Sequence, residues 1–105
     1  MSDLTFREFQ ALNARRCAEA FHDPTDWPLE MWALAIAGEA GELANLVKKV
    51  KRGDFTLDSQ CTAILHEVAD VMTYCDLLVT FLGADTDAML MAKFDLVSAR
   101  VRWKQ

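Results

Sequence analysis

Hydrophobic residues recur along this chain at intervals of three and four, which is the period of an amphipathic helix and not of a strand. The stretches between these segments are short and polar, and both prolines lie in one of them. The pattern therefore predicts an all-α fold. The predicted helices run from Ser2 or Asp3 to Phe21, from Leu29 to about Lys51, from Asp58 or Ser59 to about Leu82, and from Asp85 or Thr86 to about Trp103.

Residues at the helix ends support these limits. The polar residues at the predicted starts can accept hydrogen bonds from the free N–H groups of a first turn. The prolines in residues 22–28 cannot continue a helix, and Gly53 and Gly83 follow helix ends. Four helices joined by such short loops predict a compact four-helix bundle, in which sites are built between facing helices.

Length and composition narrow the class of protein. The chain has 105 residues, 52% of them apolar, which predicts a single domain over residues 1–105 with more apolar surface than its own core can hide. Self-association is therefore expected. The net charge of -5 argues against a nucleic acid polymer as partner, because contacts to a phosphate backbone need a basic surface.

The cysteines and the start of the chain indicate a cytoplasmic protein. Cys17, Cys61 and Cys75 are odd in number and lack metal-ligand spacing, so we expect buried thiols in a reducing compartment. The first residues do not form the apolar core of a signal peptide. Because no uncharged apolar run reaches membrane-spanning length, no membrane partner is expected.

Two acidic pairs stand on or beside the apolar sides of the second and third predicted helices. Glu39 and Glu42 are three residues apart, as are Glu67 and Asp70, so each pair shares one side of its helix. At about 100° per residue, Glu39 and Glu67 fall within the apolar sectors, and the other two lie at their margins. Ionised carboxylates in such places repel one another and are costly to desolvate, so something must neutralise them.

A metal ion is the favoured partner for these acids. Ligand sets made only of oxygen suit a hard cation, and Mg²⁺ (or Mn²⁺ in its place) binds a few carboxylates together with water and phosphate. Salt bridges to Lys48, Lys49 or Lys93 would be the purely structural alternative. A di-iron bundle is disfavoured, because neither pair has a histidine at its third place, although His66 precedes Glu67.

The segments that carry the acids resemble a known enzyme family. Residues 38–45 read Gly-Glu-Ala-Gly-Glu-Leu-Ala-Asn, and residues 67–71 read Glu-Val-Ala-Asp-Val. This combination of Glu-x-x-Glu and Glu-x-x-Asp is similar to the signature of the MazG-like nucleoside triphosphate pyrophosphohydrolases, in a small bacterial and phage branch related to the dCTP pyrophosphatases. Segments 48–54, 70–78 and 93–100 extend the likeness over nearly the whole chain.

The resemblance implies a fold, a reaction and an assembly. It implies an oligomeric all-α bundle that hydrolyses (deoxy)nucleoside triphosphates to the monophosphate and pyrophosphate, as a house-cleaning enzyme of the nucleotide pool. It implies Mg²⁺ bound by the catalytic residues Glu39, Glu42, Glu67 and Asp70. It also implies a homodimer or homotetramer with active sites near the interface between subunits.

Several cations and one amide are candidates for contact with the phosphates. Lys93 and Arg100 are seven residues apart on one side of the last predicted helix, and both suit phosphate oxygens. Asn45 and Lys49 lie beside Glu42 by helical spacing. For each cation the alternative is a solvated side chain.

Three further residues are candidates for contact with the base or sugar. Tyr74 lies one turn beyond Asp70 and can stack on a base, while Trp32, on the side of Glu39, is more typical of core packing. His22, together with Trp27, stands in the proline-flanked loop and is placed to gate a base pocket. A non-catalytic helical module that binds a nucleotide, a metal or another protein stays open as the alternative function.

Overall fold

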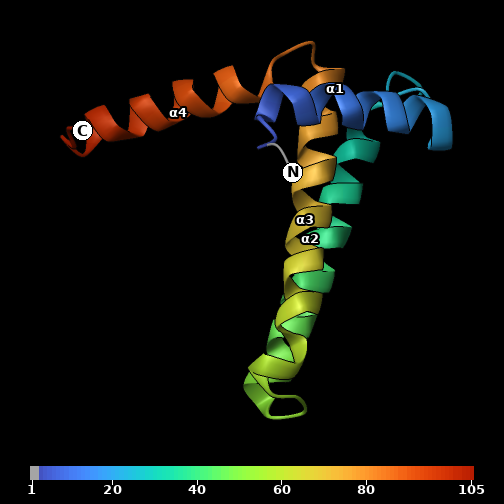
Figure 1. Ribbon diagram of the computed structural model, residues 1–105, viewed down its shortest axis with the longest axis vertical. Helices are drawn as coiled ribbons and strands as arrows, with labels where there is room; N and C mark the ends of the chain where they lie inside the picture. Colours follow the sequence, from blue (N-terminus) through green and yellow to red (C-terminus); the bar gives the residue numbers. More distant parts are fainter. Residues whose placement is uncertain (1–2) are drawn as a thin grey trace.

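The computed structural model describes residues 3–105, which form four α-helices and one turn of π-helix (Figure 1). In chain order the elements are α1 (Phe6–Arg16), the π-helix η1 (Cys17–Phe21), α2 (Leu29–Arg52), α3 (Leu57–Phe81) and α4 (Thr86–Arg100). No strand occurs in the part of the chain described, so the predicted all-α class is confirmed. Within residues 3–105, no helix combines the length and the hydropathy that crossing a membrane requires.

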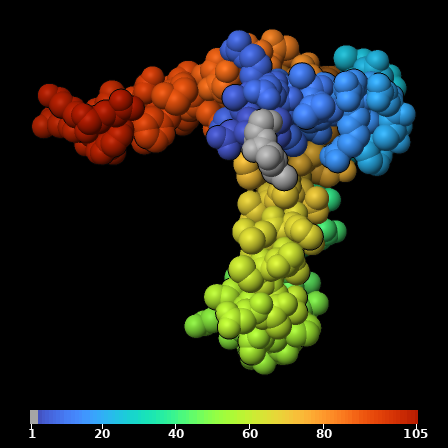
Figure 2. All heavy atoms as spheres, in the orientation of Figure 1, coloured from blue at the N-terminus to red at the C-terminus, as the bar shows by residue number. Residues whose placement is uncertain are grey.

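The two long helices α2 and α3 lie side by side as an antiparallel hairpin, and the other helices gather at one end of it (Figure 1). At that end α1 crosses the hairpin and packs on α3. Helix α4 leaves the same end and extends away, and within the described chain it packs only on α1 and α3. The space-filling view in Figure 2 shows the open corner that this leaves between α4 and the hairpin.

A threonine hydroxyl sets the start of α1. The Thr5 side chain accepts a hydrogen bond of 3.1 Å from the N–H group of Glu8, three residues on. The predicted cap at Asp3 is therefore wrong, because a cap must stand two or three residues before the N–H group that it satisfies. The other predicted cap, Ser2, lies outside the described residues.

The start of α3 follows the same rule, whereas the residue in the cap position of α4 makes no side-chain capping bond. Thr56 accepts a hydrogen bond of 3.1 Å from the N–H group of Ser59, so Thr56 is the cap and the predictions of Asp58 or Ser59 are wrong by two or three residues. Asp85 stands in the cap position of α4, as one of the two predicted starts for that helix.

Glycines end both helices of the hairpin. Gly53 follows α2 and Gly83 lies just past α3, with φ angles of 95° and 74°. This left-handed backbone closes the last helical turn, and only glycine adopts it without steric strain. The predicted ends of α2 and α3 are confirmed to within one residue, whereas α4 ends at Arg100 and not at Trp103.

The core is small and lies where α1, α2 and α3 meet. Cys17, Trp32 and Leu77 are buried there, Trp32 completely. Partly buried side chains that pack against them are Trp27, Tyr74, Leu78 and Phe81. Of the three cysteines predicted to be buried, Cys61 and Cys75 are instead exposed on α3. That prediction is wrong for these two, because helices within residues 3–105 leave their side of α3 uncovered.

A buried polar cluster joins α1, α3 and α4 at the same junction. The Asp76 carboxylate, in a residue only 4% exposed, accepts hydrogen bonds from the Asn13 amide at 2.9 Å and from the Thr86 hydroxyl at 2.5 Å. Nearby, the Gln10 amide donates to Thr80 Oγ1 at 3.0 Å. A buried carboxylate is tolerated only when its oxygens accept hydrogen bonds. These contacts therefore fix the orientation of α1 and of α4 relative to α3.

Within one chain the helices do not close into a compact bundle. The Cα radius of gyration is 16.4 Å, whereas a compact chain of this length has a value of about 13 Å. The accessible surface is 7856 Å², against roughly 5,900 Å² for a compact monomer of this mass. Large apolar side chains on α4 contribute to this excess, with exposed fractions of 37% to 56%: Met89, Leu90, Met91, Phe94, Leu96 and Val97.

Replacing Asp76 with alanine tests the buried cluster. The change leaves the Asn13 amide and the Thr86 hydroxyl without their shared acceptor, so we expect the free energy of unfolding to fall by about 2 kcal/mol. Urea denaturation followed by circular dichroism measures it. Asp95→Ala, at an exposed position of α4, should change stability by less than about 0.5 kcal/mol. Equal losses in the two variants would contradict the role of Asp76.

Candidate functional site

The predicted acids meet about midway along the hairpin. Glu39 from α2 and Glu67 and Asp70 from α3 each offer a carboxylate oxygen, and these three oxygens lie within 4.8 Å of one another. Glu42 stands beside them, close enough for its charge to act on both Glu39 and Glu67. Spacing along each helix and the antiparallel pairing thus bring all four together, and we call them the acidic cluster.

Two oxygens of the acidic cluster are buried without a hydrogen-bond partner, Oε2 of Glu39 and Oε2 of Glu67. Burial raises the pKa of both carboxyl groups above the usual range, and the negative charge of Glu42 raises each pKa further. A bare buried oxygen in a folded protein requires a water, an ion or a ligand as its partner. The cluster is therefore a candidate binding site.

Basic side chains do not neutralise the acidic cluster. Within residues 3–105 the ion pairs are Arg7–Asp87, Arg15–Glu19 and Arg52–Asp54. Lys48, Lys49 and Lys93, the cations considered from the sequence, do not pair with the four acids in the described chain. A donor set made of carboxylate oxygens fits Mg²⁺ or Mn²⁺, which favour oxygen ligands and retain open positions for water and phosphate.

A cavity of about 290 Å³ opens beside the acidic cluster, at the end of the hairpin that α1 crosses. Glu39 and Asp70 form part of its wall, so the cluster and the cavity make one continuous site. The rest of the wall consists of Asn13, Arg16, Cys17, Phe21, His22, Trp27, Thr73, Tyr74 and Leu77. We call it the aromatic cavity, and its size is at the small end of ligand pockets, which suits a single ring system.

Three rings give the aromatic cavity flat surfaces. The rings of His22 and Trp27 stack with their centroids 4.3 Å apart, and Trp27 and Tyr74 are nearly parallel, at 8° and 6.3 Å. Trp32 lies behind Trp27 at 4.6 Å and is fully buried, so it supports the wall without forming it. His22 and Tyr74 thus reach the cavity, while Trp32 has the core position that its sequence context favoured.

Local hydrogen bonds hold the loop that carries His22 and Trp27. Asp23 Oδ1 accepts from the N–H group of Thr25 at 2.9 Å and from its hydroxyl at 2.7 Å, and these bonds lower the pKa of Asp23. The Cys17 thiol donates to the His22 carbonyl at 3.2 Å. Burial raises the pKa of this thiol, which favours its protonated form, and the protonated thiol can donate this bond to the loop.

Asn13 and Arg16 belong to the cavity wall but were not among the residues predicted for the site. Both N–H groups of the Asn13 amide are used, by the Thr73 carbonyl and by Asp76, so its carbonyl oxygen is the group left for a ligand. Arg16 adds a permanent positive charge. One signal was present, since Asn13 stands four residues before Cys17 on the buried side of α1, where a polar residue is uncommon.

The remaining predicted contacts lie outside the aromatic cavity. Asn45 and Lys49 follow Glu42 by one and two turns along α2, toward the tip of the hairpin. Lys93 and Arg100 are exposed on α4, which extends away from the hairpin (Figure 1). Within one chain, the fold does not bring Lys93 or Arg100 to the acidic cluster.

The raised pKa values of Glu39 and Glu67 predict how stability depends on pH. The folded protein binds protons more readily than the unfolded chain, so the metal-free protein should lose stability as pH rises above the ordinary glutamate value of 4.5. Glu39→Gln or Glu67→Gln removes one charge and should raise the melting temperature at neutral pH and flatten this dependence. Thermal denaturation with a chelator, across pH 4.5–8, measures both effects.

The matched control is Glu19→Gln, at an exposed position with only a 4.0 Å pair to Arg15. It should leave the melting temperature and its pH dependence unchanged. If the three glutamine variants behave alike, the repulsion attributed to the acidic cluster is absent.

Comparison of the chain with family models, with curated proteins and with solved structures finds no match. The resemblance of the acidic motifs to the MazG-like enzymes therefore stays an expectation. The acidic cluster and the aromatic cavity share Glu39 and Asp70, so a ligand of this site would contact both.

Proposed function

We propose that this chain is a Mg²⁺-dependent nucleoside triphosphate pyrophosphohydrolase of the MazG-like type. The observation that carries the proposal is the pair of bare carboxylate oxygens, on Glu39 and Glu67, beside a cavity with aromatic walls. A site for a hard cation is thereby joined to a site for a planar ring. A nucleotide bound with a divalent cation meets both requirements, and the likeness of the two acidic motifs supports the same class.

The base of the nucleotide occupies the aromatic cavity in this proposal. Trp27, Tyr74 and His22 offer stacking surfaces, and stacking on such rings accepts any base. The cavity holds a base but not a whole triphosphate, so the phosphate chain leads out past Glu39 and Asp70. Arg16 in the same wall is available to a phosphate oxygen near the sugar.

Glu39, Glu42, Glu67 and Asp70 would hold the cation, and their oxygen-only donor set fits it. Bound Mg²⁺ would neutralise phosphate oxygens and lower the pKa of a bound water. One of the four carboxylates, for which Glu39 is the candidate, would take the proton from the attacking water instead of binding the cation. Water then attacks the α-phosphorus and pyrophosphate leaves on the opposite side.

With this activity we propose a cytoplasmic homodimer or homotetramer. The bundle that one chain leaves open would be completed by helices of a second chain. Lys93 and Arg100, which one chain holds away from its own acidic cluster, would then be available to the phosphates bound by a neighbour.

Activity should require the acidic cluster and a divalent cation. We expect pyrophosphate release from a panel of canonical and modified triphosphates with Mg²⁺ or Mn²⁺, and its loss with a chelator. Glu42→Gln and Asp70→Asn should lower kcat by more than about 100-fold while circular dichroism shows intact helices. Glu30→Gln, exposed at the start of α2, is the control with full activity. Binding of a triphosphate without turnover by the unmodified chain would instead favour the non-catalytic module.

The products distinguish this class from other hydrolases. Attack at the α-phosphorus yields the monophosphate and pyrophosphate, and reaction in ¹⁸O-labelled water should place the label in the monophosphate. Anion-exchange chromatography and mass spectrometry read both outcomes. Diphosphate with orthophosphate, or label in the pyrophosphate, would show attack at another phosphorus.

A further inference from the structure

The Asn13 side chain is held in one orientation by two acceptors. Its amide N–H groups donate to the Thr73 carbonyl at 3.0 Å and to Asp76 Oδ2 at 2.9 Å. Turning the amide over would set its oxygen against a carbonyl and a carboxylate, neither of which can donate a hydrogen bond. Asp76 is held in turn by the Thr86 hydroxyl, at 2.5 Å. The nitrogen of the Asn13 amide is therefore fixed on the side of α3, and its oxygen Oδ1 is turned away from both acceptors.

The Oδ1 atom of Asn13 faces the aromatic cavity. Asn13 is only 3% exposed and forms part of the cavity wall. Among the described residues, the side-chain nitrogen and oxygen atoms that are fully enclosed without a hydrogen-bond partner belong to Trp32, Glu39 and Glu67. Oδ1 of Asn13 accepts no hydrogen bond within residues 3–105 and yet is not enclosed, so its free lone pairs reach the space of the cavity. An acceptor in such a place selects for a ligand that can donate to it.

Two other residues of the wall offer acceptors as well. The Thr73 hydroxyl donates its hydrogen to the Ala69 carbonyl at 2.8 Å, so Oγ1 can only accept from a ligand. The His22 Nδ1 lies 3.0 Å from the Asp23 carbonyl, which cannot donate, so Nδ1 carries the hydrogen and Nε2 of the neutral ring is an acceptor. Both residues belong to the wall together with Asn13. The polar part of the cavity thus offers acceptors from three different residues.

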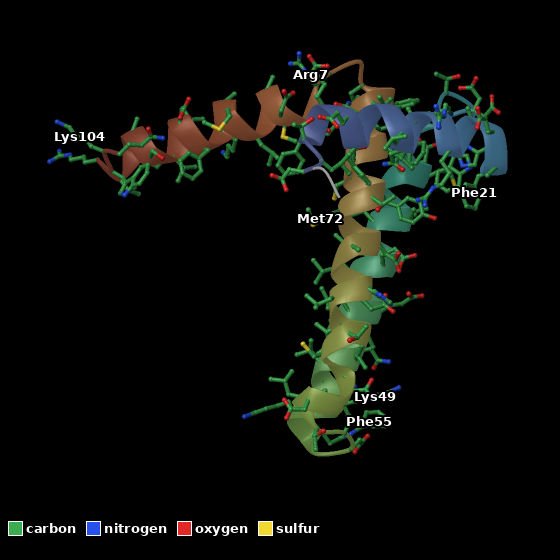
Figure 3. The ribbon with its side chains drawn as sticks, in the orientation of Figure 1. Arg7, Phe21, Lys49, Phe55, Met72 and Lys104 are labelled. Atoms are coloured by element: carbon green, nitrogen blue, oxygen red, sulfur yellow. The ribbon has the colours of Figure 1, made fainter. Side chains whose placement is uncertain are left out.

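Donors are fewer in this wall. Of the described residues that form it, Arg16 alone carries a permanent positive charge, and its side chain is exposed on α1, where a phosphate oxygen can reach it. The Tyr74 hydroxyl can donate or accept and therefore excludes neither kind of group. Figure 3 shows Lys49 near the tip of the hairpin and Phe21, another residue of the wall, at the opposite end, so this lysine does not reach the cavity. A ring stacked in the cavity therefore meets mainly acceptors at its edge.

A base can meet such a wall with an exocyclic amine but not with a carbonyl. Cytosine and adenine carry an amine with two N–H groups at the edge where uracil, thymine and hypoxanthine carry a carbonyl. The two N–H groups of one amine can serve two neighbouring acceptors. A carbonyl in the same place would face Oδ1 of Asn13 with lone pairs on both sides. The ring N–H group beside that carbonyl is a poor substitute, because presenting it to one acceptor brings the carbonyl against the next.

We infer that Asn13 is a specificity-determining residue of the aromatic cavity, and that its Oδ1 atom selects nucleotides whose base carries an exocyclic amine. The ligand of the cavity is taken to be a nucleotide, so this assignment rests on the proposed function. Stacking on Trp27 and Tyr74 holds any base, whereas Oδ1 of Asn13, with Oγ1 of Thr73, determines which edge fits. A base that leaves Oδ1 without a donor should bind more weakly by about tenfold to a hundredfold.

Matched pairs of nucleotides test which edge the cavity accepts. The α,β-imido analogues of dCTP and dUTP differ in amine against carbonyl, as do those of dATP and dITP, and none of the four can be cleaved at the α-phosphorus. With Mg²⁺ and the unmodified chain, quenching of tryptophan fluorescence should give the amino member of each pair a Kd at least about tenfold lower. Equal affinities within a pair, a preference for the carbonyl member, or no binding of any analogue would overturn the inference.

Alanine variants of two amides on α1 test the residue itself. Asn13→Ala should abolish the preference, chiefly by weakening the amino member of each pair. Gln10→Ala is the matched control, because Gln10 bonds to Thr80 Oγ1, the Ala84 carbonyl and the Thr86 N–H group but lies outside the cavity wall. It should lower stability and keep the preference. If both variants keep the preference, or both lose it, Asn13 does not determine specificity. The comparison on the unmodified chain stands whether or not a variant folds.

Binding and turnover separate this assignment from the proposed function. Pyrophosphate release from the natural triphosphates is measured alongside the Kd values of their imido analogues. A preference for the amino member without pyrophosphate release would support the role of Asn13 and count against the hydrolase alone. Pyrophosphate release with equal Kd values within each pair would overturn the role of Asn13 and leave the hydrolase in place.

Discussion

Repulsion among four carboxylates within the contact between α2 and α3 is the constraint on which the rest of this structure depends. Over most of the hairpin the two helices can bury apolar surface, but at Glu39 and Glu67 they surround oxygens that have lost water without gaining a partner. The helices are held together on both sides of this point. Trp32 and Leu77 pack at one end, and the tight turn at Gly53 joins the helices at the other. The packing on one side and the turn on the other thereby hold the acidic cluster at its place in the hairpin.

The junction around Asp76 connects this cluster to the aromatic cavity. Asn13 is bonded to both Asp76 and the Thr73 carbonyl, so α1 can cross the hairpin in only one register. That register sets Arg16 and the residues after it beside Asp70. A polar contact buried at the junction therefore determines which side chains stand next to the acids, although Asp76 itself is not part of the cavity wall.

Features fixed by neighbours in the sequence could be predicted, and features fixed by the packing of distant segments could not. The spacing of Glu39, Glu42, Glu67 and Asp70 was enough to bring them together, because helical periodicity and a short turn leave few alternatives. The membership of the cavity wall depends on the angle between α1 and the hairpin, which no local pattern encodes. The exposure of Cys61 was likewise missed, because an apolar residue on a long helix gives no sign of which side its own chain leaves uncovered.

The π-helical turn at Cys17–Phe21 has a consequence for how this site can change over evolution. The His22 N–H group bonds to the Cys17 carbonyl, five residues back, at 2.8 Å, where an α-helix would bond to the fourth. The turn thus absorbs one residue beyond the α-helical count and rotates Phe21 and His22 by about 100° from a regular continuation. Deletion of one residue here would convert the turn to α-helix and change which side chains face the aromatic cavity. The acids on the hairpin would keep their positions, so the walls of the aromatic cavity can change in evolution without moving the acidic cluster.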